Sequence, residues 1–288
     1  MRFIKFQGFG NDYIIFEAGE VAAVERFDEF VRAICDRHYG AGADGIVTLS
    51  RAERAAGADF VAHIFNADGS EAGLSGNGTR CAAAYLHYTG LWSRAELRLQ
   101  TQTGVKLYSL RERTGDGHYW FDSELGQPRF DSASIPMLTD TLMERVVSYP
   151  LVAGGETWPI TALSIGNPHC LIFVNDFEAV DWRRAGGMIE SHPRFPERIN
   201  VTFIRVLDRD NIEIRIWERG VGETLSSGTC SCAAAIASIV NGKTERRVHV
   251  ATPGGRIQVV WREDGEVVLT GRADIAYSGQ WLGSQSAR

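Results

Sequence analysis

The hydrophobic and polar positions of this chain form many short stretches that predict a fold dominated by strands. Runs rich in β-branched and aromatic residues, separated by glycine and asparagine turns, are typical of strands. Such runs cover 3–6, 13–16, 46–49, 59–65, 95–101, 104–110, 117–122, 171–174, 212–217, 256–261 and 266–270. Apolar residues recur at a helical period over 27–38, and 183–190 are helical in character. We therefore expect a mixed α/β fold.

Two segments of the chain repeat each other at a fixed offset. The stretch 74–84 (LSGNGTRCAAA) and the stretch 225–235 (LSSGTCSCAAA) each predict a tight Ser-Gly turn that opens an alanine-rich helix. Ser75 and Ser227 lie 227 − 75 = 152 residues apart. A repeat of this length is too long for a solenoid and indicates that a whole domain was duplicated. Each copy would be mainly β-structure with a helix behind its Ser-Gly turn, and the boundary is expected within 125–128.

The repeated turn suits an anionic ligand. The first backbone N–H groups of a helix lack partners and carry partial positive charge, so they bind a carboxylate or phosphate well. We expect Gly76–Asn77 and Gly228–Thr229 to hold one small ligand, with Ser75 and Ser227 on its opposite sides. Opposed acid/base groups suit racemisation or epimerisation, because one side removes a proton and the other returns it. A single serine here would more simply be an N-cap, so the repetition is what favours a site.

Composition and charge narrow the class of protein. Of the 288 residues, 44% are hydrophobic and 23% charged, as in soluble globular proteins. The net charge of −6 disfavours nucleic acid or an anionic membrane as a partner. No stretch approaches the roughly 20 apolar residues of a membrane span, and no signal-peptide pattern opens the chain. Five cysteines, an odd number, do not indicate a disulfide framework, so we expect a cytoplasmic protein.

The motif search favours chemistry without a cofactor. The sequence has no phosphate-binding P-loop, no dinucleotide fingerprint and no zinc-ligand spacing. Cys230 and Cys232 form a Cys-x-Cys pair, which we interpret as small helix residues rather than as metal ligands. We therefore expect neither a cofactor nor a metal.

Several further motifs give the chain a family resemblance. They are Gly8–Asp12, Asn66–Glu71, Gly76–Cys81, Gly166–Cys170, Phe195–Asn200 and Glu218–Thr224. With them the chain resembles the diaminopimelate epimerase family over essentially its whole length and in family order. The resemblance implies a cofactor-independent isomerase of lysine and cell-wall precursor synthesis, which interconverts LL- and meso-diaminopimelate, a small amino acid.

The resemblance also implies a fold and a set of site residues. The fold would be α/β, with two pseudo-symmetric domains, each a β-barrel-like sheet around a central helix. The domains would cover 1–126 plus 272–288, and 127–271; members are often dimers, so a homodimer is left open. His169 and Glu218 would tune the acid/base pair. The implied substrate-binding residues are Asn11, Asn66, Gly76, Asn77, Asn167, Asn200, Glu218, Arg219, Gly228 and Thr229.

One departure from the family matters more than the others. The family uses two cysteines as its acid/base pair, and this chain has Ser75 and Ser227 at those positions. A thiol titrates near pKa ~8.5 in model peptides, and a serine hydroxyl is a much weaker acid. A serine can still act when a neighbour accepts its proton, and by family analogy His169 is the candidate.

Three hypotheses about function stay open at this point. The chain is a diaminopimelate epimerase that works through its serines or is disabled by them. Alternatively, it is a related isomerase or lyase that acts on another amino acid through serine hydroxyls. The third hypothesis is a non-catalytic protein that binds an amino acid in the same pocket.

Overall fold

The described chain folds into two compact units. The computed structural model describes residues 1–53, 57–73, 75–115 and 117–283, so 284–288 of the predicted first domain lie outside it. The first unit comprises Met1–Ser123 and Gly271–Arg288, and the second comprises Glu124–Thr270. Within the described ranges, no helix is long and apolar enough to cross a membrane.

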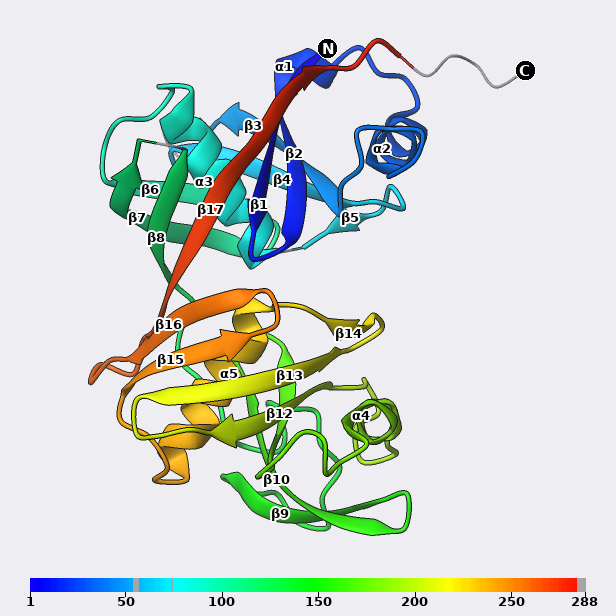
Figure 1. Cartoon of the computed structure of the whole chain (residues 1–288), viewed down its shortest axis with the longest axis vertical. Helices are drawn as coiled ribbons and strands as arrows, with labels where there is room; N and C mark the ends of the chain where they lie inside the picture. The colour runs from blue at the N-terminus through cyan, green and yellow to red at the C-terminus, as the bar shows by residue number, and fades with distance from the viewer. Residues whose placement is uncertain (54–56, 74, 116, 284–288) are drawn as a thin grey trace. The chain divides into compact units, whose positions relative to one another are not determined.

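The first unit is a closed sheet with a helix inside it. Its strands pair in the closed order β17–β1–β2–β3–β4–β6–β7–β8–β17. The pairs β2–β3 and β4–β6 are parallel, and the pairs β17–β1, β1–β2, β3–β4, β6–β7 and β7–β8 are antiparallel. The helix α3 packs against β1, β2, β3, β4 and β6 (Figure 1). The elements are β1 (Arg2–Gly8), β2 (Asn11–Glu17), α1 (Ala18–Val21), α2 (Phe27–Cys35), β3 (Gly45–Arg51), β4 (Phe60–Asn66), β5 (Glu71–Ala72), α3 (Gly76–Tyr88), β6 (Glu96–Thr101), β7 (Gly104–Thr114) and β8 (His118–Glu124).

The second unit repeats this succession of strands around α5. Its strands pair in the order β9–β10–β11–β12–β13–β15–β16–β17, and again the third and fifth of these pairs, β11–β12 and β13–β15, are parallel. The long strand β17 begins in this unit and ends in the first. The elements are β9 (Val146–Ala153), β10 (Glu156–Ser164), β11 (Pro168–Phe173), α4 (Trp182–Glu190), β12 (Asn200–Val206), β13 (Asn211–Glu218), β14 (Gly222–Thr224), α5 (Gly228–Val240), β15 (Arg247–Thr252), β16 (Gly255–Trp261) and β17 (Val267–Gln280).

The two central helices occupy the same place in the repeat. Helices α3 and α5 both have 13 residues, and both their first and their last residues are 152 positions apart (228 − 76 and 240 − 88). Each helix begins at the predicted Ser-Gly turn. The structure therefore confirms the predicted α/β fold of two similar domains, each with a curved sheet around a central helix.

Small side chains allow each helix to lie inside its sheet. Ala82, Ala83 and Ala84 of α3 are fully buried among aromatic and aliphatic residues of the surrounding strands. Ala233–Ala235 of α5 are equally buried. Protein interiors are packed as tightly as organic crystals, so no volume is left there for a larger residue. This fit fixes the position of each helix and of the serine that precedes it.

Local chemistry explains where the sequence-based bounds were wrong. The helix expected over 27–38 ends at Cys35, because the Asp36 carboxylate accepts hydrogen bonds from the backbone of His38 and Tyr39 and forms a turn. The strand β9 was not predicted. It contains Pro150, which lacks a backbone donor and therefore masks a strand in the sequence.

The packing of α3 and α5 predicts a matched pair of destabilised variants. Ala83→Leu and Ala235→Leu should each lower the free energy of unfolding by about 1–3 kcal/mol, because the added side chain overpacks a full core. Ala95→Leu, at an exposed position, should change it by less than about 0.5 kcal/mol. Urea denaturation followed by circular dichroism measures all three. Wild-type stability in both buried variants would show that the cores have unfilled space.

Candidate active site

In the first unit, which is the first half of the repeat, the candidate residues are arranged around Ser75, at the start of α3. Ser75 is the N-cap of this helix, and its hydroxyl Oγ accepts a hydrogen bond from the backbone N–H of Gly78 at 3.0 Å. Its backbone carbonyl accepts from the N–H and the hydroxyl of Thr79, at 2.9 and 2.7 Å. The same Oγ lies 2.8 Å from the phenol oxygen of Tyr13 on β2. The serine is therefore held from three directions, and its side chain shares a hydrogen bond with a tyrosine.

The ring of Tyr13 fits a slot made by two glycines. A Cβ atom added to Gly78 would lie 3.2 Å from the ring, and one added to Gly45 would lie 3.0 Å from it and 2.3 Å from the carbonyl oxygen of Phe65. Only residues without a side chain allow the strand, the ring and the helix start to approach so closely. Burial raises the pKa of Tyr13 to about 12, so the phenol stays protonated at neutral pH.

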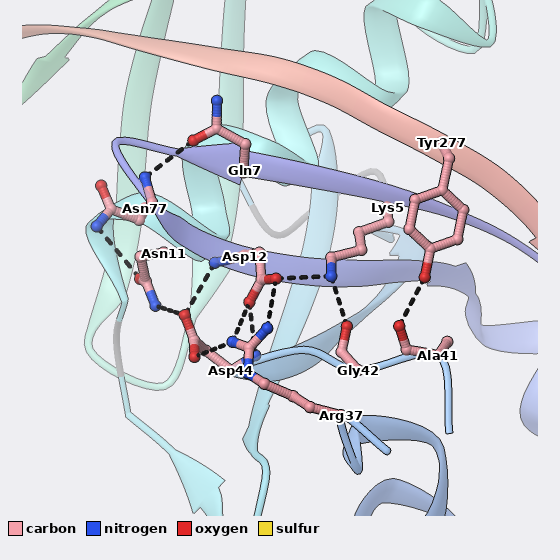
Figure 2. Close-up of polar contacts among 11 residues, drawn as sticks. Lys5, Gln7, Asn11, Asp12, Arg37, Ala41, Gly42, Asp44, Asn77 and Tyr277 are labelled. Atoms are coloured by element: carbon pink, nitrogen blue, oxygen red, sulfur yellow. Dashed lines mark hydrogen bonds and ion pairs between the residues drawn. The ribbon is translucent and has the colours of Figure 1, made fainter. Parts of the chain in front are cut away.

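A network of charged side chains holds Asn11 beside this helix start (Figure 2). The Asn11 amide donates to Asp44 at 2.7 Å and its oxygen accepts from the Asn77 amide at 3.2 Å. Arg37 binds both Asp12 and Asp44, and the ammonium of Lys5 lies 2.6 Å from Asp12. These bonds fix the orientation of the Asn11 and Asn77 side chains.

The same network keeps its central carboxylate charged. Burial opposes ionisation of Asp12, but the hydrogen bonds from Arg37 and Lys5 hold the pKa of this group below its ordinary value. The guanidinium of Arg80 also donates to the Asn77 oxygen, which links the network to α3. The predicted residues Asn11 and Asn77 therefore belong to one rigid, hydrogen-bonded cluster.

Two other predicted residues of this half lie at its edge. Asn66, the last residue of β4, is exposed, and its amide donates to the hydroxyl of Ser70 at 3.0 Å. Gly76 is exposed at the first position of α3, and its carbonyl accepts from Arg80 at 3.2 Å. Both are accessible to solvent, as a ligand contact requires.

In the second unit, the second half of the repeat, the candidate residues are arranged around Ser227, at the start of α5, and their contacts differ from those in the first unit. Ser227 is again the N-cap, but its side chain makes no capping hydrogen bond. The carboxyl group of Glu218 accepts a hydrogen bond from the Thr224 hydroxyl at 2.6 Å. Burial raises the pKa of Glu218, and the nearby side chains of Thr224 and Ser227 offset part of that shift. A raised pKa makes this carboxylate a stronger base than an ordinary glutamate.

His169 lies inside the second unit rather than at its surface. The ring is fully buried, and its Nε2 atom is 2.8 Å from the Asn167 side-chain oxygen. Burial, followed by the positive charge of Arg219, lowers the pKa of His169 to about 3, so the ring is neutral. The Asn167 amide is directed to the hydroxyl of Thr229 at 3.4 Å. These three residues therefore form a neutral chain of contacts that reaches the start of α5.

Asn200 and Arg219 complete the predicted set. The Asn200 amide donates to the carbonyl of Pro168 at 2.9 Å, and its oxygen accepts from the backbone N–H of Arg219 at 3.0 Å. Asn200 is buried and connects β11 to the turn after β13. The Arg219 side chain is exposed and donates to the carbonyl of Glu197 at 3.2 Å. Gly228 and Thr229, at the start of α5, are partly exposed.

Sequence reasoning missed Tyr13, which is hydrogen-bonded to Ser75, and Thr224, which donates a hydrogen bond to Glu218. One signal for Tyr13 was present in the sequence. Tyr13 follows Asn11 by two positions, as His169 follows Asn167 in the second copy of the repeat. The signal was weak, because a tyrosine in a strand is ordinary core material.

Comparison with known proteins identifies the family. The family model described as diaminopimelate epimerase matches residues 3–130 and 161–276. A diaminopimelate epimerase of Pelotomaculum thermopropionicum is 42% identical over 98% of this chain and 99% of its own length, and one of Cyanothece sp. is 39% identical over 97% and 99%.

Solved structures of lower identity share the fold. A phenazine biosynthesis protein of the PhzF family from Bacillus anthracis has a TM-score of 0.70 at 17% identity, covering 98% of this chain and 99% of its own. A hydroxyproline epimerase from Agrobacterium vitis has a TM-score of 0.67 at 14% identity, covering 97% and 91%. By its sequence match over nearly its whole length, the chain belongs to the diaminopimelate epimerase family.

Proposed function

We propose that this protein is an isomerase that interconverts LL- and meso-diaminopimelate without a cofactor. Its membership of the family over nearly the whole chain is the observation that carries the proposal. The described residues hold no cluster of His, Cys, Asp or Glu that could bind a metal ion. Two equivalent helix starts supply groups for acid/base chemistry, because the Ser75 hydroxyl is hydrogen-bonded to Tyr13 and the Ser227 side chain influences the pKa of Glu218.

The substrate carboxylate would bind to the backbone at the helix starts. The first N–H groups of α3 and α5, near Gly76–Asn77 and Gly228–Thr229, have no partner within their own helix. An α-carboxylate there is stabilised by these donors and by the helix dipole. The oriented amides of Asn11 and Asn77 offer further hydrogen bonds to a polar substrate.

The reaction would exchange one proton on each side of the α-carbon. On one side Ser227 takes the α-proton while its own hydroxyl proton passes to Glu218. On the other side Ser75 gives its hydroxyl proton to the α-carbanion. The C–H bond that breaks and the one that forms lie on opposite faces, so the configuration inverts. The proposal requires Ser75 and Ser227 to act on one α-carbon.

Glu218, rather than His169, would be the proton acceptor for Ser227. The Ser227 side chain influences the Glu218 carboxyl group, and burial raises the pKa of that group. His169 has a pKa of about 3 and its ring is bound to Asn167, so protonating it at neutral pH would be costly. His169 would instead serve as a neutral support for Asn167 and the start of α5.

We also propose that the protein works in the cytoplasm. Its cysteines Cys35, Cys81, Cys170, Cys230 and Cys232 are free and buried, which suits a reducing compartment. The expected homodimer stays a prediction, which sedimentation equilibrium would test.

The first prediction concerns turnover itself. In heavy water the wild-type protein should incorporate deuterium at the α-carbon of LL-diaminopimelate, and Ser75→Ala or Ser227→Ala should abolish epimerisation. Ser75→Cys/Ser227→Cys should raise the rate by about 10²-fold or more, because each pKa unit removed saves about 1.36 kcal/mol in forming the anion. NMR of the α-proton signal measures exchange. Its absence in both the wild type and the double-cysteine variant would contradict the proposed function, and its absence in the wild type alone would show that the serines disable the enzyme.

The second prediction tests Glu218. Glu218→Gln should lower kcat by roughly 10²-fold, because the amide cannot take the Ser227 proton, while KM changes little. Glu223→Gln is the matched control. Glu223 is an exposed glutamate of the same unit that accepts a hydrogen bond from Arg183. Its replacement should leave kcat within about twofold. Equal losses in both variants would remove Glu218 from the mechanism.

The third prediction follows from the buried His169. The pKa of His169 is lower in the folded state than in the unfolded state, so the unfolded state takes up a proton first as the pH falls. The free energy of unfolding therefore decreases below about pH 6.5. Between pH 6.5 and 5 the free energy of unfolding should fall by up to about 2 kcal/mol more in the wild type than in His169→Gln. Urea denaturation at both pH values measures this. The exposed His38→Gln should keep the wild-type pH dependence, and an identical dependence in His169→Gln would show that the ring titrates normally.

A further inference from the structure

The two units of the repeat have different residues at equivalent positions. Strands β2 and β11 correspond in the repeat, because each runs parallel to the strand that follows it. Tyr13 is opposite Gly45 in the first pair, and His169 is opposite Asn200 in the second. Tyr13 therefore occupies in the first unit the position that His169 occupies in the second.

The strand ends next to the serines also differ. Strands β4 and β13 end at Asn66 and Glu218, which are 218 − 66 = 152 residues apart. In the second unit this position holds a carboxyl group whose pKa the Ser227 side chain influences, whereas Asn66 in the first unit is bonded to Ser70. Ser75 thus has a hydrogen-bonded phenol beside it, and Ser227 has a titratable carboxyl group in its electrostatic surroundings.

The position of the phenol is fixed by packing. The Tyr13 ring lies against Gly45 and Gly78, and Gly78 also supplies the N–H that binds the Ser75 oxygen. A side chain on either glycine would displace the ring from the helix start. The 2.8 Å contact between the two hydroxyls is therefore built into the first unit by three separate segments of its chain.

We propose that Tyr13 is a positioning residue for Ser75 that resupplies the proton which this serine donates during epimerisation. The inference rests on the proposed function and names the group that allows a serine to act as the proton donor. The Tyr13–Ser75 pair would then be the acid side of the site and the Glu218–Ser227 pair the base side, for the direction in which Ser227 removes the α-proton.

The proposed step balances in protons and charge. The Ser75 O–H bond breaks as a new C–H bond forms at the α-carbanion, which leaves negative charge on Oγ. The Tyr13 O–H proton moves to that oxygen, and the charge passes to the phenolate. A phenol is a stronger acid than an aliphatic alcohol, so this transfer is favourable. Solvent then returns a proton to Tyr13, and in the reverse reaction every transfer runs backward.

A double-mutant cycle separates this role from packing. The four proteins are the wild type, Tyr13→Phe, Ser75→Cys and the double variant, and kcat and KM are measured for epimerisation of LL-diaminopimelate. Tyr13→Phe keeps the ring in its slot and removes only the hydroxyl. It should lower kcat by about 10- to 100-fold in the serine enzyme, with KM within about twofold. In the Ser75→Cys background the loss should be under about threefold, because a thiolate is stable without a phenol.

Tyr85→Phe is the matched control. Tyr85 is a buried tyrosine of the same unit with a pKa also raised to about 12 by burial, but its hydroxyl is bonded to Glu17 at 3.3 Å. Its replacement should leave kcat within about twofold in both backgrounds. Circular dichroism and thermal unfolding of each variant exclude a folding defect as the cause of a lost rate.

The possible outcomes are distinguishable. An active wild type with an equally active Tyr13→Phe would overturn the role of Tyr13 and leave the proposed function intact. An equal loss in the serine and cysteine backgrounds would show a packing role and also overturn it. A wild type that does not turn over while Ser75→Cys/Ser227→Cys does would overturn both proposals for the natural serines.

Discussion

A helix of small side chains enclosed by a curved sheet is the constraint on which each unit depends. The alanines of α3 and α5 leave no room between helix and strands, so neither helix can shift along its axis without opening a cavity or a clash. The N-terminal turn of each helix is fixed in consequence. This packing also fixes the positions of Ser75 and Ser227. The Thr79 hydroxyl donates to the backbone carbonyl of Ser75, and the Ser231 hydroxyl donates to that of Ser227.

The scaffold is duplicated, but the chemistry placed on it is not. Both serines precede equivalent helices, yet the Ser75 hydroxyl is hydrogen-bonded to a phenol, whereas Ser227 influences the pKa of a carboxyl group, that of Glu218. A two-base reaction needs one group that holds its proton and one that has given it up at the same moment. Equivalent partners would have equal proton affinities, whereas a tyrosine of raised pKa and a half-buried glutamate do not. Because the two copies have diverged in sequence, the groups near the two serines differ in proton affinity, which two identical copies would not.

The charged network behind Asn11 supports the site without taking part in proton transfer. Lys5, Arg37, Asp12 and Asp44 neutralise one another, and only the Lys5–Asp12 pair is largely buried, because Arg37 and Asp44 are partly exposed. Their hydrogen bonds leave the amide of Asn11 one orientation. The corresponding support in the second unit is neutral, because His169 holds Asn167 and is itself buried.

The sequence by itself determined the strand-rich fold, the duplication and the family. These features are periodic or local: alternating apolar residues, turn residues, and a Ser-Gly-helix unit repeated at one offset. The tertiary structure alone decided which side chain each serine touches. Tyr13 is 62 residues from Ser75 in the chain and reaches it only because β2 lies against the start of α3. The neutral state of His169 likewise comes from its complete burial in the folded unit. Hydropathy reports which face of an element is buried, but partners across elements depend on strand register and helix placement, which the local pattern does not encode.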